Sequence, residues 1–427
     1  MSAIGAIIGL TLSILLIIRK IPALYSLMIG AVAGGLIGGF TLPQTVTLML
    51  DGVKDITPAV LRILAAGVLS GVLVKTGAAA SISNGIVRTL NERHTFLAVA
   101  FATMLLTAIG VFIDVAVITV APIALSLARR LSISKEGILL AMIGGGKCGN
   151  IISPNPNTIA AAENFNADLT SVMYVNLAAA IIGLLFVSYV LIRLIPKQGK
   201  LGKSGKQEKW GTPVTDDDIS DRDDRLPSFA VSMVAPAVTI LLLSLRPLCG
   251  IVIDPLIALP AGGLTGILAM RKWKLTKASI GYGLEKMSFV AILLIGTGTI
   301  AGIIKASTIK DVLLDALSHT PFGEALIAPI SGALLSGATA STTAGATVAS
   351  SSFAGIITAA GISAVWGAAM TNAGATILDH LPHGSFYHAT GGSVNMSFNT
   401  RLKLIPYETL VGIFLTVASF CTYCMIS

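Results

Sequence analysis

The sequence predicts an all-α protein that crosses a membrane many times. Hydrophobic residues make up 54% of the 427 residues and charged residues only 12%, whereas soluble domains carry about 25% charged residues. The mean hydropathy is correspondingly high, at +0.85. Apolar runs near the length of about 20 residues that a helix needs to cross a bilayer recur along the chain, and the plan of the first half recurs in the second. These observations predict two repeats of transmembrane helices.

The first half opens with three apolar runs, which are the first expected membrane spans: 3–18, 21–40 and 56–74. A polar, amphipathic stretch follows at 77–94. The next apolar run, 96–128, is too long for one helix and is interrupted by Gly110 and Asp114. We expect it to be a re-entrant hairpin, which enters and leaves the membrane on one side.

Two further runs complete the first repeat, 1–195. The run 138–162 is broken by glycines and prolines and is expected to be a discontinuous helix, whereas 171–195 is a plain span. Residues 196–227 are rich in Lys, Asp and Gly, a composition typical of a solvated linker.

The second repeat, 228–427, follows the same plan. Its first three expected spans are 229–245, 251–270 and 287–304. The interrupted run 325–354 corresponds to the first hairpin, 362–378 begins a second broken segment, and 410–426 closes the chain. Weak internal similarity of this kind is typical of repeat transporters.

The repeats are expected to be inverted. Gly110 falls opposite Gly337 and Asp114 opposite Ser341 when the halves are aligned. Each half then has about five crossings, and an odd number turns the second half over relative to the first.

Basic residues agree with one orientation of this arrangement, with both termini outside, because cytoplasmic loops carry an excess of Lys and Arg. The expected cytoplasmic residues are Arg19, Lys20, Arg88, Arg93, Arg129, Arg130, Lys135, Lys197, Lys200, Lys203, Lys206, Lys209, Arg271, Lys272, Lys274, Arg401 and Lys403. The expected outer loops contain Asp51, Asp55, Glu163 and Asp168. The net charge of +8 therefore indicates membrane orientation rather than a nucleic-acid partner. We expect a multi-pass protein of the bacterial cytoplasmic membrane.

Four interruptions of the apolar runs are the candidate site: 110–114, 144–157, 337–343 and 371–382. Within a bilayer, non-helical backbone is tolerated only where it is buried in protein or lines a cavity. Helix N-termini at such breaks suit a carboxylate, and hydroxyl and amide side chains can bind the rest of a substrate. The expected substrate-binding residues are Lys147, Asn150, Ser153, Asn155, Asn157, Ser341, Thr342, Thr343, Thr371 and Asn372.

Asp114 is the sharpest single candidate, because a carboxylate costs roughly 2.5–3.5 kcal/mol at the centre of a membrane helix. It is expected either to couple protons or orient substrate, or to cap a half-helix. Lys147 could attract an anionic substrate, extend to the interface, or pair with Asp114. The GGGK string around Lys147 is not a phosphate-binding loop, which requires G-x-x-x-x-G-K-[ST].

Asp379, His380 and His383 lie beside the last break and are further proton-coupling candidates, since histidine titrates near neutral pH. The alternative is a set of polar groups at a cytoplasmic vestibule. Neither a metal site nor a cofactor is expected, because zinc requires more ligands than this cluster offers. A membrane-embedded enzyme is disfavoured for the lack of an HExxH motif or a nucleophile–base set.

Two stretches carry a family resemblance. GVFIDVAVITVAPIAL (110–125) and ISPNPNTIAAAENFNADL (152–169) resemble gluconate permeases of the gluconate:proton symporter family, within the ion transporter superfamily. The resemblance covers most of the chain and is weakest in the linker. It implies inverted repeats with paired hairpins, proton-coupled uptake of sugar acids or related hydroxy-acids, and a homodimer as a candidate assembly.

By position, the resemblance places at the site Asp114, Asn150, Pro154, Asn155 and Pro156 in the first half, and Thr371, Asn372 and Asp379 in the second. Gluconate permeases carry histidines around the double-proline loop where this chain has Asn150 and Asn155, which leaves other carboxylates open as substrates.

The function expected from these features is secondary transport of a small organic anion with a proton, sodium being the less favoured coupling ion. A cation/proton antiporter is the alternative. It usually needs several intramembrane carboxylates near its crossed helices, and Asp114 is nearly alone.

Overall fold

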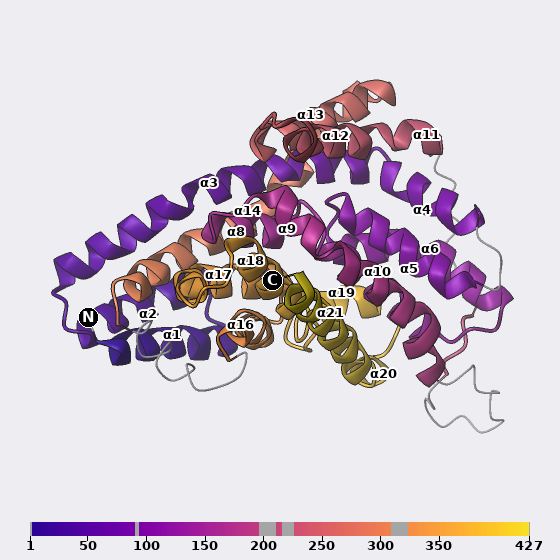
Figure 1. Ribbon diagram of the computed structural model, residues 1–427. Coiled ribbons are helices and arrows are strands. Elements are labelled where there is room, and N and C mark those ends of the chain that lie inside the picture. Colours follow the sequence, from indigo (N-terminus) through magenta and orange to yellow (C-terminus); the bar gives the residue numbers. More distant parts are fainter. Residues whose placement is uncertain (1, 90–93, 196–210, 216–225, 309–322, 427) are drawn as a thin grey trace.

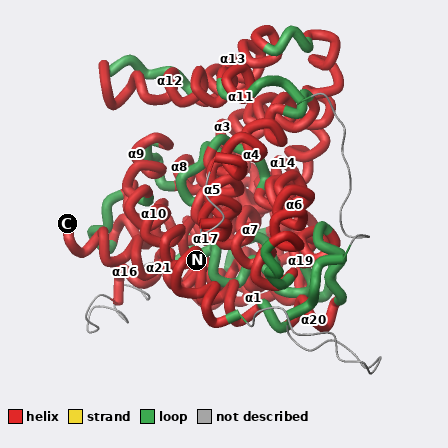
Figure 2. Tube along the Cα trace, turned by 90° about the vertical axis from the view of Figure 1, so that its right-hand side faces the viewer, coloured by secondary structure: helices red, strands yellow, loops and turns green. Residues whose placement is uncertain are grey.

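The computed structural model describes residues 2–89, 94–195, 211–215, 226–308 and 323–426, and within them it is built of helices and contains no strand (Figure 1 and Figure 2). Five helical segments in this part of the chain are long and apolar enough to cross a membrane: Leu42–Lys75, Leu169–Leu194, Phe229–Arg246, Trp273–Lys305 and Phe398–Ile426. Shorter apolar helices accompany them. The expected all-α membrane class is confirmed.

Two long helices, α3 (Leu42–Lys75) and α14 (Thr276–Lys305), cross at the centre of the fold. Their contact is made by glycines. A Cβ on Gly52 would lie 2.1 Å from the Gly298 carbonyl oxygen, and one on Gly283 would lie 2.0 Å from that of Gly67. Low-numbered residues of α3 thus meet high-numbered residues of α14, so the two helices run antiparallel.

Both long helices exceed the expected spans, 56–74 and 287–304. They contain 34 and 30 residues, about 50 and 45 Å at 1.5 Å per residue, whereas the bilayer core is about 30 Å thick. A capping box between Thr41 and Gln44 starts α3 well before its apolar window. The outer loop expected at Asp51 and Asp55 is therefore wrong: both lie within α3, where Asp55 pairs with Lys305 of α14.

A helical hairpin flanks each side of this central pair. The hairpin of α1 (Ala3–Ile18) and α2 (Ala23–Ile37) contacts α14 through α2. The hairpin of α12 (Val234–Cys249) and α13 (Pro255–Ala269) contacts α3 through α13. Figure 1 shows the two hairpins on opposite sides of α3 and α14.

Two further hairpins contain the expected interruptions of the long apolar runs. In the first, α5 (Thr95–Ala108) turns at Gly110, whose φ of +99° favours glycine, into α6 (Ile113–Arg130). In the second, α16 (Gly323–Thr339) turns at Ala340 into α17 (Thr342–Ala359). The short α4 (Ala78–Thr89) precedes the first hairpin and occupies the expected amphipathic stretch.

Each half ends with one discontinuous segment followed by a span. In the first half, α7 (Lys135–Asn150) and α8 (Pro156–Asn164) lead into α9 (Leu169–Val175), α10 (Leu177–Leu185), the short π-helix η2 (Phe186–Val190) and the 3-10 helix η3 (Leu191–Leu194). In the second half, α18 (Ala364–Gly374) and α19 (Ser385–Gly392) lead into α20 (Phe398–Leu402) and α21 (Ile405–Ile426). The short α11 (Phe229–Ser232) precedes α12, and η5 (Trp273–Leu275) precedes α14.

Most of the expected linker lies outside the described residues, but its short piece 211–215 is placed against α7. The buried carboxylate of Glu136 accepts hydrogen bonds from the backbone N–H of Gly211 (3.3 Å) and from the N–H and hydroxyl of Thr212. These residues therefore supply hydrogen bonds to a buried carboxylate. Glu136 lies in the first turn of α7, where the helix dipole favours a negative charge.

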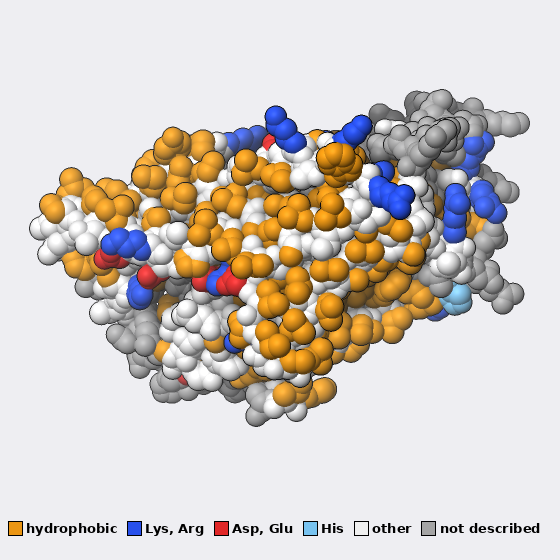
Figure 3. All heavy atoms as spheres, turned by 90° about the horizontal axis from the view of Figure 1, so that it is seen from above, with side chains coloured by type: hydrophobic (Ala, Val, Ile, Leu, Met, Phe, Trp, Pro, Cys, Tyr) orange, Lys and Arg blue, Asp and Glu red, His pale blue; other side chains and the backbone are white. Residues whose placement is uncertain are grey.

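The exposed surface is largely apolar. Large side chains such as Ile4, Leu241, Phe289 and Met425 are exposed. Figure 3 shows one face on which hydrophobic side chains cover broad areas, while charged side chains gather in a few places. Such a surface is suited to contact with lipid.

Candidate functional site

The double-proline loop breaks the first discontinuous segment for a local reason. Pro154 lacks the N–H that would continue α7, and Pro156 occupies the first position of α8, where no N–H is needed. The Asn155 side chain caps α8 by accepting a hydrogen bond from the Thr158 N–H at 3.2 Å. The expected break thus ends one helix and starts another inside the fold.

The glycines of the GGGKCG string have a packing role. A Cβ on Gly145 would lie 1.9 Å from the Ala100 carbonyl oxygen of α5, and one on Gly149 would lie 2.1 Å from that of Met104. These glycines let α5 approach the backbone of α7 closely. Lys147 points elsewhere, toward α18 and α21.

Amide side chains from the two halves meet at the breaks. Asn157 Nδ2 donates to Asn372 Oδ1 at 2.7 Å, and Asn372 Nδ2 donates to the Thr158 hydroxyl at 3.0 Å. Asn155 also donates to the side chain of Asn150. The cluster is buried, and it joins residues more than two hundred positions apart in the chain. The structure therefore brings four of the predicted amides together.

Two predicted hydroxyls in these segments lack partners. Ser153 Oγ and Thr371 Oγ1 are fully buried, and within the described part of the chain neither makes a hydrogen bond. A buried hydroxyl without a partner costs free energy and is uncommon in native structures. The two groups therefore have unused hydrogen-bonding capacity in the same segments as the amide cluster.

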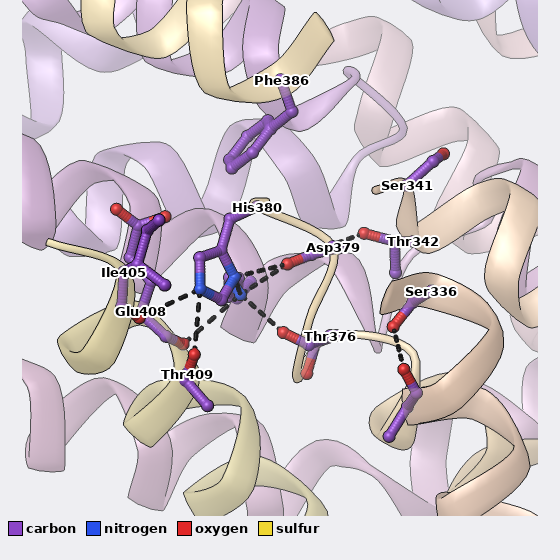
Figure 4. Close-up of polar contacts among 12 residues, drawn as sticks. Ser336, Ser341, Thr342, Thr376, Asp379, His380, Phe386, Ile405, Glu408 and Thr409 are labelled. Atoms are coloured by element: carbon purple, nitrogen blue, oxygen red, sulfur yellow. Dashed lines mark hydrogen bonds and ion pairs between the residues drawn. The ribbon is translucent and has the colours of Figure 1, made fainter. Parts of the chain in front are cut away.

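Lys147 lies at the centre of a second buried cluster, one helical turn before Asn150. Its ammonium donates to Asp379 Oδ1 at 2.6 Å and to the Thr376 carbonyl at 2.5 Å, and lies 3.0 Å from His380 Nδ1. Thr342 donates to the other Asp379 oxygen, Oδ2, at 2.5 Å. Figure 4 shows Asp379 and His380 in the loop after α18, with Thr342 on one side and Thr409 of α21 on the other.

His380 faces different partners with its two ring nitrogens. Nδ1 lies 3.0 Å from the Lys147 ammonium and 3.2 Å from Asp379 Oδ1, whereas Nε2 lies 3.0 Å from the Ile405 carbonyl oxygen and 3.1 Å from the Thr409 hydroxyl. His380 is accordingly a buried member of the cluster and not part of an exposed vestibule.

Asp114 is not the partner of Lys147, which pairs with Asp379, so the alternative in which Lys147 pairs with Asp114 is wrong. The Asp114 carboxylate is half-buried in the first turn of α6 and accepts a hydrogen bond from the Val115 N–H at 2.9 Å. Tyr282 of α14 lies close enough to interact with it electrostatically. This position is compatible with both a capping and a coupling role.

The other predicted residues are dispersed. Ser341 caps α17 by accepting a hydrogen bond from the Ala344 N–H at 3.3 Å, and Thr343 is half-buried beside it. His383 is exposed and does not join His380. Only Leu381 and Pro382 separate the two histidines in the chain.

A cavity of about 720 Å³ opens beside α8, between the central helices and α17. Its polar lining includes Asn164, Ser351 and Ser352, together with Glu163 and the Asp55–Lys305 pair. The Ser352 hydroxyl is buried and has no hydrogen-bond partner in the part of the chain that the structure describes. Sequence reasoning missed these residues, although three consecutive serines at 350–352 in an apolar run are a visible signal.

An ion cluster of Arg62, Asp254 and Glu163 lies beside a smaller cavity of about 170 Å³. Arg62 of α3 pairs with Asp254, which precedes α13, at 2.7 Å, and also with Glu163 of α8. The hydrogen bond from Arg62 is the main cause that lowers the pKa of Asp254, and a backbone hydrogen bond from Leu256 acts in the same direction. Arg62 therefore forms ion pairs with carboxylates of two other segments.

Comparison with known proteins agrees with this architecture. The model of the GntP family permeases matches residues 1–261, and that of a Na+-H+ antiporter family matches residues 230–320. An uncharacterized transporter of Haemophilus influenzae is 53% identical over 98% of this chain and 97% of its own length. The low-affinity gluconate transporter of Escherichia coli K12 is 23% identical over 76% of this chain and 73% of its own.

Among solved structures, the YdaH transporter of Alcanivorax borkumensis has a TM-score of 0.63 and 13% identity, covering 90% of this chain and 89% of that one, which shows a shared fold. The family match covers more than half of the chain, and the Haemophilus relative is similar over nearly all of it. The chain therefore belongs to the GntP family of permeases, and it is a multi-pass membrane transporter rather than an enzyme.

Proposed function

We propose that the protein is a secondary transporter that carries a small organic acid, gluconate or a related sugar acid or hydroxycarboxylate, together with a proton across the bacterial cytoplasmic membrane. The observation that carries this proposal is the pair of buried, unpartnered hydroxyls, Ser153 and Thr371, beside the amide cluster. A polyhydroxylated acid offers both donors and acceptors to such groups. The gluconate transporter among the relatives supports this substrate class.

The binding region would lie between the discontinuous segments of the two halves. Asn150, Asn155, Asn157 and Asn372 would rearrange their mutual hydrogen bonds to receive substrate hydroxyls. The N-terminus of α8 supplies positive potential for a carboxylate, and Lys147 is a further substrate-binding candidate, which is paired with Asp379 in this conformation. The cavity beside α8 provides an approach from one side.

The two halves, 1–195 and 228–427, are proposed to be inverted repeats around this site, joined by the cytoplasmic linker 196–227. Support comes from the corresponding helices α3 and α14, which run antiparallel and contact each other through glycines. The reciprocal contacts of α2 with α14 and of α13 with α3 agree with the same symmetry. Alternating access would then move the discontinuous segments relative to these long helices.

Proton coupling is assigned to Asp114, with Asp379, His380 and His383 as further candidates. Asp114 is half-buried, and its carboxylate accepts a hydrogen bond from the Val115 N–H but has no ion-pair partner among the described residues. A proton shifts the equilibrium between two states only if it binds one of them more tightly. A homodimer is the proposed assembly, on the family resemblance.

The test is uptake by purified protein in liposomes, with a panel of labelled sugar acids and short hydroxy-acids and with pH and sodium gradients imposed separately. Accumulation of one acid under a pH gradient alone is the expected result. Accumulation under a sodium gradient alone would retain the substrate class and replace the coupling ion. Absence of uptake under both gradients would contradict the proposal.

A cation/proton antiporter is the second candidate, favoured by the match of residues 230–320 to a Na+-H+ antiporter family. The same liposomes distinguish the two functions. Proton flux driven by a sodium gradient in the absence of any organic acid would identify the antiporter.

A further inference from the structure

The surroundings of the Lys147 ammonium are arranged like the ligands of a cation. Three oxygen acceptors surround Nζ: the Thr376 carbonyl at 2.5 Å, Asp379 Oδ1 at 2.6 Å and the Glu408 carbonyl at 3.4 Å. His380 Nδ1 lies 3.0 Å from the same atom. An ammonium has three N–H donors, which the three oxygens match, and oxygens are the atoms that hard cations prefer.

The charges of the site balance only because of Lys147. The Lys147 and Asp379 side chains are 0% and 2% exposed. The neighbouring Glu408 side chain pairs with Arg401, so its charge is already compensated. Without the ammonium, the Asp379 carboxylate would therefore be an uncompensated buried charge, which is strongly unfavourable.

The acceptors are held in place independently of Lys147. Thr342 of α17 donates to Asp379 Oδ2 at 2.5 Å and leaves Oδ1 directed at the ammonium. Thr376 follows the C-terminal end of α18, where the helix dipole favours positive charge. The Glu408 carbonyl belongs to the first turn of α21. Removal of the lysine side chain would thus leave a preorganised, oxygen-lined space with a net negative charge.

We propose that this is a monovalent-cation site, of the sodium class, that the chain fills with its own tethered ammonium. One carboxylate and two backbone carbonyls match a single positive charge. The lysine comes from the first half of the chain, and the ligands come from the second. If the protein is the proton-coupled transporter proposed above, the Lys147 ammonium takes the place of a sodium ion at this position. The proton then remains as the coupling ion.

The test is the thermal stability of purified Lys147→Ala in sodium, potassium and choline chloride at equal ionic strength. Sodium is expected to raise the Tm of Lys147→Ala by several degrees over choline, in a saturable way, while the wild type shows no such difference. Lys147→Met is the matched control, because its unbranched side chain fills the space without a charge and should be insensitive to sodium. Lys147→Ala/Asp379→Asn, which lacks the carboxylate, should lose the sodium effect.

Each other outcome overturns the proposal. If sodium changed the Tm of the wild type and of all variants equally, the change would be a general salt effect. A Lys147→Ala protein that Asp379→Asn recovers but no cation stabilises would identify a structural ion pair. A Lys147→Ala protein that no cation recovers would also exclude replacement of the ammonium by a free cation. The readout is stability, so failure of this inference is distinguishable from failure of the transport proposal.

Discussion

At the scale of single residues, substitution of an unpartnered hydroxyl should affect substrate binding without affecting the stability of the fold. Ser153 Oγ makes no hydrogen bond in the described structure, so Ser153→Ala removes no native hydrogen bond and should leave the Tm unchanged or slightly raised. A hydrogen bond to a charged group contributes about 1.5–3 kcal/mol, so loss of such a bond to the substrate should raise KM roughly tenfold or more. Labelled-acid uptake and thermal unfolding measure the two effects.

Ser188 provides the matched control for this prediction. Its hydroxyl is likewise buried and without a hydrogen-bond partner among the described residues, but it belongs to η2 and to none of the four breaks. Ser188→Ala should therefore change neither KM nor stability by much. Equal effects of the two substitutions on uptake would remove Ser153 from the binding site.

Asp114 is predicted to couple transport to the proton gradient. Asp114→Asn keeps the size of the side chain and an oxygen that can accept the hydrogen bond from Val115, so the protein should remain folded. Accumulation driven by a pH gradient should be lost, while exchange of labelled for unlabelled acid across the liposome should continue. Asp51→Asn, at an exposed carboxylate of α3, is the control. Undiminished accumulation by Asp114→Asn would leave Asp114 with the capping role alone.

The sequence could identify most residues of the buried clusters but not their partners. Asn155, Asn157 and Asn372 stand out as amides at breaks in apolar runs, because the hydrophobic pattern of the sequence shows where such breaks occur. The partner of Lys147 is set by tertiary contact, because Asp379 lies 232 positions away. Asp114 was the nearer carboxylate in sequence and is not the partner in space.

At the scale of elements, the crossing of α3 and α14 depends on glycine. A Cβ at Gly283 would lie 2.0 Å from the Gly67 carbonyl oxygen, so Gly283→Ala must separate the helices. We expect a loss of about 1–3 kcal/mol, the usual cost of overpacking a core. Thermal unfolding in detergent measures it.

Gly281 is the control on the same helix. A Cβ there meets no atom within 4 Å, so Gly281→Ala should gain about 0.5–1 kcal/mol from the better helix propensity of alanine. A Gly283→Ala protein as stable as Gly281→Ala would show that the crossing tolerates separation.

The lengths of the central helices were the main error at this scale. Apolar windows locate the part of a helix inside the bilayer, whereas Asp51, Lys54 and Asp55 lie on an exposed part of α3 that extends further. Polar residues do not end a helix unless a cap or a breaker is present. The capping box at Thr41 was the sequence signal for the true start.

At the scale of the whole molecule, the Arg62 cluster ties three elements together and should make the fold sensitive to acid. Because the folded pKa of Asp254 is lowered, its contribution to stability is present above the unfolded value near pH 4 and is lost as pH falls through the folded value. The Tm should therefore decline more steeply below about pH 4 in the wild type than in Asp254→Asn. Parallel declines would indicate that this ion pair contributes nothing to the pH dependence.

The orientation of the molecule in the membrane is the last prediction, and the natural cysteines can test it. Inverted repeats with both termini outside place the end of α12, and so the exposed Cys249, on the outer face. In a Cys421→Ser/Cys424→Ser background, Cys249 and the buried Cys148 are the remaining thiols. A membrane-impermeant maleimide should then label intact cells, and Cys249→Ser should abolish the labelling. Lys274→Cys, placed in this cysteine-depleted chain between α13 and α14, should react only in inverted vesicles. The reverse labelling pattern would show that the molecule has the opposite orientation in the membrane. Labelling of both positions from one side would contradict a membrane crossing by α13.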